Sequence, residues 1–185
     1  MEVRQLKFPG VWEVTPRIFH DNRGEFTEGF VQHKLQSATG ENFNVAQLNI
    51  STSTRGTIRG IHFSQLPPGQ AKYVQCTAGQ IIDFIVDVRA DSPTFGQWDH
   101  VILDSATHNA VHIPSGFGHA FQALTDSATV VYLCDSPYSP DAELSVNPLD
   151  PQIALNFPIA QHVLSDKDLQ APNLADIDRQ KLPRP

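Results

Sequence analysis

The chain has 185 residues, 40% of them hydrophobic, and a formal net charge of −7 at pH 7. A chain of this length can bury a single core without disulfide or metal crosslinks, and no apolar run in it approaches the roughly 20 residues that a membrane span needs. Its acidity argues against general nucleic-acid binding, which requires a basic surface, but leaves room for a local basic pocket that holds a small anion.

No secretory signal is recognisable at the N-terminus, where charged and apolar residues are mixed. The two cysteines, Cys76 and Cys134, lie in apolar runs and are expected to be buried free thiols. We therefore expect one domain over residues 1–185, resident in the cytoplasm, that binds neither membranes nor nucleic acid.

The predicted elements are mostly strands. After a long N-terminal strand, a short helix is expected at 29–38 and a strand at 80–88. That strand alternates between two faces, with Ile82, Phe84, Val86 and Val88 on one and Asp83, Ile85 and Asp87 on the other. The aspartates are assigned to a polar face, where Asp83 could border a site. Further strands are expected at 99–105, 109–115 and 128–136.

Turn residues separate these strands, and the chain contains 14 prolines and 11 glycines. The pattern is typical of an antiparallel sandwich or barrel. Beyond Pro151 the chain looks irregular, with one or two helical turns expected within 165–180. We predict an all-β fold without internal repeats or a second domain.

One run of apparent strand, 59–76, carries Arg59, His62 and Lys72 close together. Such a group is either an ordinary solvated strand edge or one wall of a site for an anionic ligand that loses a proton to a base. The composition of the run leaves both possibilities open.

A second motif, Pro114-x-Gly116-x-x-His119, is the second half of a cupin-type pattern and predicts a double-stranded β-helix, or jelly-roll, barrel. Metal-binding cupins add a His-x-His pair and a glutamate to this histidine. Here His62 is followed by Phe63 and Ser64, and Lys72 stands where a carboxylate ligand would be sought. Because an ammonium group repels a cation, we predict a barrel without a metal or any other cofactor.

The chain resembles the RmlC-like dTDP-4-dehydrorhamnose 3,5-epimerases in an ordered set of runs from about residue 16 to 170. The matching runs are 21–30, 46–51, 56–63, 67–76, 83–98, 113–121, 131–140 and 164–168. The resemblance implies an isomerase whose substrate is a dTDP-4-keto-6-deoxyhexose.

The protons at C3 and C5 of such a sugar flank the C4 ketone, so that removing either one gives an enolate. The site then needs a base, an acid on the opposite face and a cation near the C4 oxygen. The resemblance implies that His62 is the base, oriented by Asp168, that Tyr132 is the acid and that Lys72 stabilises the enolate.

The resemblance also implies the residues that bind the nucleotide, the diphosphate and the sugar. They are Arg23, Phe26, Glu28, Gln47, Asn49, Arg59, Lys72, His119, Tyr138, Glu143 and Lys167. Arginine suits a diphosphate because its planar fork pairs with it at two points, and Phe26 is expected to stack on the thymine. A homodimer is implied in which N-terminal strands cross between subunits, so that Arg23 and Glu28 would serve the partner's pocket.

Several alternatives remain open from the sequence. An epimerase of antibiotic deoxysugar biosynthesis that inverts C3 alone would carry the same acid and base. A non-catalytic nucleotide-sugar-binding jelly roll would need the arginines but not both His62 and Tyr132. A metal-dependent cupin is disfavoured by Lys72. The run that follows Glu143 also departs from the family, because it lacks the arginine-glycine-isoleucine sequence of many members.

Overall fold

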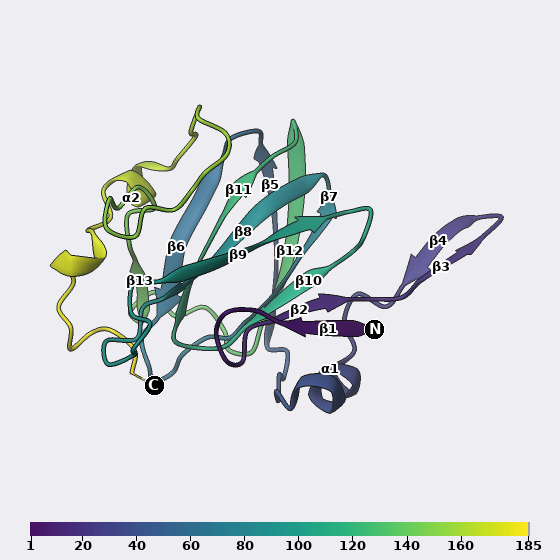
Figure 1. Cartoon of the computed structure of the whole chain (residues 1–185), viewed down its shortest axis with the longest axis horizontal. Helices are drawn as coiled ribbons and strands as arrows, with labels where there is room; N and C mark the ends of the chain where they lie inside the picture. The colour runs from purple at the N-terminus through teal and green to yellow at the C-terminus, as the bar shows by residue number, and fades with distance from the viewer. Residues whose placement is uncertain (185) are drawn as a thin grey trace.

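Two antiparallel sheets face each other in the computed structural model, which describes residues 1–184 (Figure 1). The first sheet has the order β1 (Glu2–Gln5), β2 (Trp12–Thr15), β10 (Ala110–Ile113), β7 (Lys72–Ala78), β12 (Ser127–Cys134) and β5 (Gln47–Thr54). The second has the order β13 (Glu143–Ser145), β6 (Ile58–Ser64), β11 (Phe117–Ala123), β8 (Gln80–Asp87) and β9 (Trp98–Asp104).

The chain crosses between the two sheets at most of its connections after β5. Strands β5, β7, β10 and β12 belong to one sheet, and β6, β8, β9, β11 and β13 belong to the other. This alternation is the winding of a jelly roll, so the predicted all-β, cupin-type fold is confirmed. The turn predicted at 114–116 precedes β11, and its Gly116 adopts a φ of 95°, which favours glycine.

Strand β8 is buried on both faces. Ile81 and Ile85 pack between the sheets, whereas Phe84 packs outside the barrel under the C-terminal tail. The predicted alternation is therefore confirmed, but the expectation of a polar face is wrong, because Asp83 and Asp87 are both fully buried. Each has a partner that offsets part of the cost of burial: Asp83 is hydrogen bonded to His119, and Asp87 pairs with Arg89.

Replacing Phe84 by alanine is expected to destabilise the fold by about 3–5 kcal/mol. Its ring is 0% exposed and packs edge-on against Trp98 and Phe157, so that truncation would leave a cavity. Urea unfolding would measure the loss. Ile102→Ala is the control, since Ile102 is 37% exposed on the neighbouring strand, and an equal loss in both variants would contradict this account of the core.

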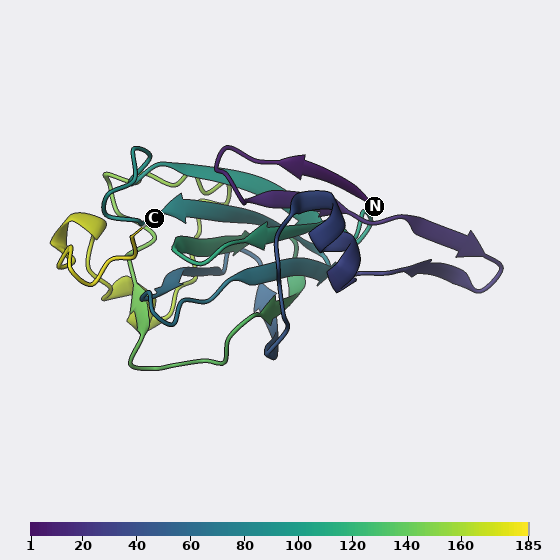
Figure 2. The ribbon, with the colours of Figure 1, turned by 90° about the horizontal axis from the view of Figure 1, so that it is seen from below.

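The N-terminal region forms four short strands rather than the single long strand expected. Gly10, at a φ of 81°, turns the chain between β1 and β2, and Pro16 then interrupts it before β3 (Ile18–Asp21) and β4 (Gly24–Thr27). These two strands form a hairpin that projects away from both sheets (Figures 1 and 2). The predicted helix follows as α1 (Gln32–Thr39) and ends at Gly40.

The segment after β13 is largely irregular, as predicted, with one short helix, α2 (Asp166–Leu169), and a 3₁₀ turn (Leu174–Asp176). It covers the outer face of the second sheet by burying Ile153, Leu174 and Leu182 there. None of the helices in the described residues is long and apolar enough to cross a membrane.

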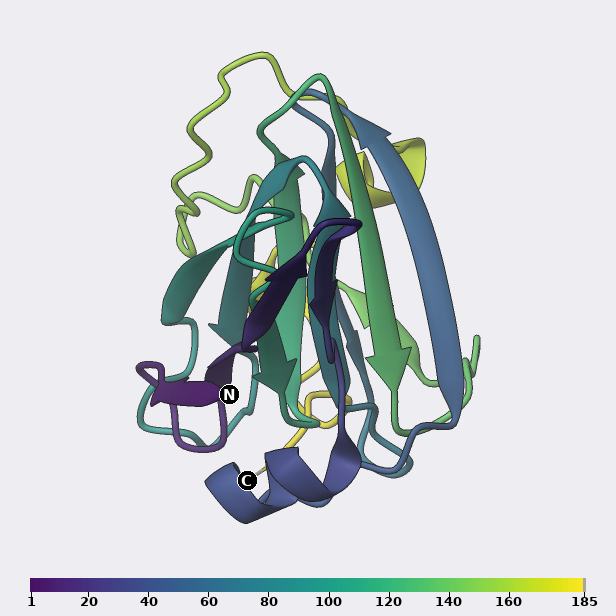
Figure 3. The same cartoon turned by 90° about the vertical axis from the view of Figure 1, so that its right-hand side faces the viewer.

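Strand β5 forms an open edge of the first sheet, with β12 as its only neighbour (Figure 3). On its outer face Leu48 and Ile50 are 55% and 66% exposed. Its other face, which carries Ser51 and Ser53, lines a cavity between the sheets.

Candidate active site

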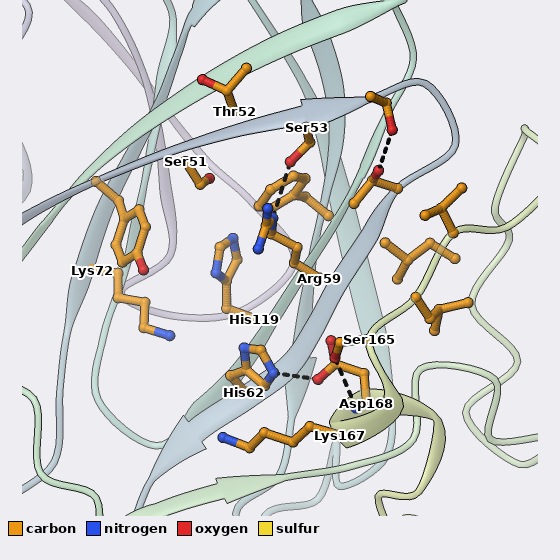
Figure 4. Close-up of a pocket in the computed structure, with 17 residues that line it drawn as sticks. Ser51, Thr52, Ser53, Arg59, His62, Lys72, His119, Ser165, Lys167 and Asp168 are labelled. Atoms are coloured by element: carbon orange, nitrogen blue, oxygen red, sulfur yellow. Dashed lines mark hydrogen bonds and ion pairs between the residues drawn. The ribbon is translucent and has the colours of Figure 1, made fainter.

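A cavity of about 490 Å³ opens between the two sheets and is lined by side chains from both of them (Figure 4). The first sheet contributes β5, Lys72 of β7 and Tyr132 of β12. The second contributes β6 and β11, and the C-terminal tail closes one side with residues 163–168. The cavity thus joins segments that are distant in sequence.

His62 and Asp168 are hydrogen bonded at this cavity, with 2.7 Å between His62 Nε2 and Asp168 Oδ1 (Figure 4). Asp168 lies in α2, where its backbone N–H donates to Ser165, the N-cap residue. Burial raises the pKa of the Asp168 carboxyl, but hydrogen bonds from His62, Ser165 and Gly60 outweigh burial and lower it. The ionised carboxylate orients the imidazole and leaves its Nδ1 available as a base.

Lys72 and Tyr132 lie on adjacent strands of the opposite sheet. Burial lowers the pKa of the Lys72 ammonium, and Cys134, Glu143 and Asp83 partly oppose this effect. Burial also raises the pKa of the Tyr132 phenol, which therefore keeps its proton at neutral pH. The cavity therefore holds the Lys72 amine and a protonated phenol across from the His62 imidazole.

A second histidine–carboxylate pair lies beside the first. His119 is the direct cross-strand neighbour of His62 on β11, and its Nε2 is 2.7 Å from Asp83 Oδ2. The sequence suggested only that Asp83 could border a site, and gave it no role there. Its place in the alternating pattern of β8 was the only signal, and that pattern does not distinguish a polar outer face from a barrel interior.

The other predicted residues of the barrel gather around this centre. Arg59 lines the main cavity, where its Nε donates to Ser53 Oγ at 3.0 Å. Lys167 also lines it and reaches Glu143 at 3.5 Å. Beyond His62 and Lys72, a smaller hollow of about 30 Å³ is lined by Glu143 and Tyr138.

Gln47 and Asn49 lie on β5 and hydrogen bond to each other, with 2.8 Å between Gln47 Nε2 and Asn49 Oδ1. Gln47 Oε1 also accepts from the backbone N–H of Tyr138 at 2.7 Å. The loop that carries Tyr138 is therefore tied to the strand that walls the cavity.

Gln47 and Asn49 lie on β5 beyond the residues that line the main cavity, and three further predicted binding residues lie away from the barrel altogether. Arg23 and Phe26 lie on the projecting hairpin, where Arg23 pairs with Asp21 and Phe26 is 65% exposed. Glu28 lies at the base of the hairpin and pairs with Lys34.

Sequence reasoning missed three serines at the site. Ser51 and Ser53 line the cavity, and the Ser51 hydroxyl is buried without a hydrogen-bond partner in the described residues. Their two-residue spacing after Gln47 and Asn49 was an available signal. Ser165 was recognisable as the first residue of a Ser-x-x-Asp helix cap.

Comparison with known proteins identifies similar chains over nearly the whole length. Residues 5–176 match the family model for dTDP-4-dehydrorhamnose 3,5-epimerase. A protein of that name from Mycolicibacterium smegmatis is 46% identical over 177 residues, which are 95% of this chain and 87% of the relative.

Two solved structures are also similar. NovW, a 4-keto-6-deoxy sugar epimerase from the novobiocin cluster of Streptomyces spheroides, has a TM-score of 0.96 and 43% identity over 100% of this chain and 93% of its own. ChmJ, a 3'-monoepimerase from Streptomyces bikiniensis in complex with dTDP-quinovose, has a TM-score of 0.92 and 46% identity over 97% of this chain and 91% of its own.

Proposed function

Since the chain belongs to the dTDP-4-dehydrorhamnose 3,5-epimerase family and is a dTDP-sugar epimerase, we propose that it inverts a dTDP-4-keto-6-deoxyhexose by proton transfer between His62 and Tyr132. The observation that carries the proposal is the His62–Asp168 pair, which faces the same cavity as Tyr132 and Lys72. Membership of this family favours the enzyme over a non-catalytic jelly roll or a metal-dependent cupin oxygenase.

In the first step His62 removes the proton from the carbon next to the C4 ketone. The electrons of that C–H bond form the enolate, whose charge rests on the C4 oxygen and is stabilised by Lys72. Asp168 stabilises the imidazolium that forms. Tyr132 then gives its phenolic proton to the opposite face of the carbon, and solvent restores the phenol and removes the proton from His62.

The binding residues are proposed to contact different parts of the substrate. Arg59 is proposed to hold the diphosphate, since the guanidinium fork can pair with two phosphate oxygens. His119 offers a hydrogen bond at the cavity wall, and Gln47 and Asn49 offer theirs further along β5, the strand that carries Ser51 and Ser53. The remaining groups, Tyr138, Glu143 and Lys167, surround the sugar end beyond His62 and Lys72.

The experiment that tests the function is proton NMR of dTDP-4-keto-6-deoxyglucose in heavy water with the purified protein. We expect deuterium to enter at C3, because both the 3,5-epimerase relative and the 3'-monoepimerase act there. Entry at C5 as well would assign a 3,5-epimerase, whereas entry at C3 alone would assign the antibiotic-sugar type. If neither carbon exchanged, the proposal would be wrong.

The reaction is proposed to need no metal or other cofactor, because Lys72 supplies the positive charge at the enolate. Prolonged treatment with a chelator is therefore expected to leave turnover unchanged. The assay should include a chelated sample to which zinc, manganese or iron(II) has been returned. Activity that falls on chelation and recovers with one of these ions would contradict the prediction.

The enzyme is proposed to be a homodimer that works in the cytoplasm. The projecting hairpin carries Arg23 and Phe26 away from their own barrel, and β5 exposes Leu48 and Ile50 at a sheet edge, which favours pairing. In such a dimer Arg23 would bind the nucleotide in the partner's cavity.

Mixing two inactive variants tests this arrangement. Arg23→Ala and His62→Asn proteins, allowed to exchange subunits, should regain about a quarter of the wild-type sites, because half of the dimers are mixed and each of these has one intact site. Turnover in the mixture is measured against the two variants alone. If Arg23 serves its own chain, the mixture will be no more active than its parts.

A further inference from the structure

The buried pair of Asp83 and His119 has one unsatisfied atom. Asp83 is 0% exposed, its Oδ2 meets His119 Nε2 at 2.7 Å, and its Oδ1 has no hydrogen-bond partner in residues 1–184. A buried carboxylate oxygen without a hydrogen-bond partner destabilises the folded state. Its presence in this protein therefore suggests a role for Asp83 in function rather than in stability.

The net charge of the pair bears on how this oxygen is tolerated. If Asp83 were ionised and His119 neutral, the pair would carry a net charge of −1 in a buried position, and one carboxylate oxygen would have no hydrogen-bond donor. If the pair holds one more proton, it is neutral whether that proton lies on Nε2 or on Oδ2. Burial raises the pKa of the Asp83 carboxyl, against the opposing effects of His119 and Lys72, which favours the neutral pair.

A proton shared in this way fixes the other ring nitrogen of His119. If the shared proton lies on Nε2, the ring is an imidazolium and Nδ1 carries a hydrogen. If it lies on the carboxyl, Asp83 donates to Nε2, and the hydrogen of the neutral ring is again on Nδ1. Nδ1 makes no hydrogen bond to another described residue, and the ring lines the main cavity (Figure 4).

We propose that Asp83 is a positioning residue that keeps this proton on its pair with His119, so that His119 Nδ1 donates a hydrogen bond to the C4 oxygen of the substrate alongside Lys72. The inference rests on the proposed epimerase reaction. The enolate oxygen would then receive donors from both sheets, Lys72 from β7 and His119 from β11. Two converging donors are the usual arrangement for stabilising an oxyanion.

The titratable groups that face the pair are Lys72 and Cys76 of β7 and His62 of β6. His62 is already engaged by Asp168 through its Nε2. Burial raises the pKa of the Cys76 thiol to about 11, so it stays neutral. Lys72 and the Arg59 guanidinium, which lines the same cavity, are therefore the nearby groups whose charge could substitute for the shared proton, and the test has to separate their effect from that of the proton.

Two substitutions of Asp83 make that separation. In Asp83→Asn the side-chain amide can turn to donate to His119 Nε2, as a protonated carboxyl would, and this keeps the hydrogen on Nδ1. Asp83→Leu removes both the charge and the partner. Deuterium exchange into the substrate is expected to stay within a few-fold of wild type in the first and to fall by about 10²-fold in the second.

The matched control is Asp87→Asn. Asp87 lies on the same face of β8 and is equally buried, but it is held by Arg89, Ser92 and Thr94 and does not line the cavity. This variant should lose stability while exchanging deuterium at the wild-type rate. Reduced exchange here would show that any buried change in β8 impairs the site, and it would overturn the assignment.

Nitrogen-15 NMR of the free enzyme near neutral pH gives a readout that needs neither substrate nor turnover. With the signal assigned through His119→Asn, Nδ1 of His119 should be protonated in wild type and in Asp83→Asn. An unprotonated Nδ1 in wild type would overturn the proposal, even if Asp83→Leu does not fold.

Equal loss of deuterium exchange in Asp83→Asn and Asp83→Leu would also overturn the proposal, since the negative charge of Asp83 would then be what matters. If wild type itself failed to exchange deuterium, the proposed function would be wrong, whereas the nitrogen signal would still report the shared proton.

Discussion

Replacing His62 by asparagine is expected to stop solvent deuterium from entering the sugar at either C3 or C5, with exchange lowered by about 10²- to 10⁴-fold. Asparagine has nearly the shape of the imidazole stem but no basic nitrogen. Asparagine is too short to replace His62 Nε2 as a donor to Asp168, but Asp168 keeps its hydrogen bond with Ser165 at the start of α2, so the fold around α2 should survive. The measurement is proton NMR of the substrate in heavy water.

Tyr132→Phe is the matched variant on the opposite face of the substrate. It removes the acid and leaves the base intact, so that His62 can still take a proton and return a deuteron to the same face. This variant should therefore wash deuterium into the substrate while inverting it poorly. Exchange at the wild-type rate in His62→Asn would mean that the base is misassigned. Normal inversion in Tyr132→Phe would place the acid elsewhere, with Tyr138 as the next candidate.

Replacing Lys72 by methionine is expected to slow deuterium exchange and inversion together, by about 10²- to 10³-fold, because both pass through the same enolate. Methionine keeps the length of the buried stem but removes the charge. Product analysis and exchange should be measured on the same sample. An effect on inversion alone would place Lys72 with the acid rather than at the oxyanion.

The alkaline side of the pH profile checks the same role. Burial lowers the pKa of Lys72, and the charged form is the active one. Activity should therefore be present below this pKa and decline above it, at a lower pH than an exposed lysine would give. The residual activity of Lys72→Met should lack this decline, whereas Lys181→Met, at an exposed lysine, should keep it.

The sequence predicted best the parts of the fold that depend on local pattern. The strands expected at 99–105, 109–115 and 128–136 correspond within two residues to β9, β10 and β12. The alternation at 80–88 placed each residue on the correct face of β8, because side chains of a strand necessarily point to opposite sides in turn.

The features of the fold and site that depend on tertiary contacts could not be predicted from local sequence pattern. The face that carries Asp83 and Asp87 looked polar, yet it is buried, since burial depends on what covers a strand. The N-terminal region looked like one strand. In the structure, the turn at Gly10 ends β1, and the strand that follows, β2, pairs with β10. Nothing in the spacing of His62 and Asp168 linked them. They are 106 positions apart, and only the resemblance to a known family suggested the pair.

The position of Asp168 in the chain has a consequence for how the enzyme is made. Every strand of the barrel, up to Ser145 at the end of β13, leaves the ribosome before the carboxylate that orients His62. A polypeptide cut short within the irregular tail would keep the strands of both sheets but would have an unsupported imidazole. The site is therefore completed only after the last strand of the barrel has been made, and a product truncated before Asp168 should turn substrate over poorly.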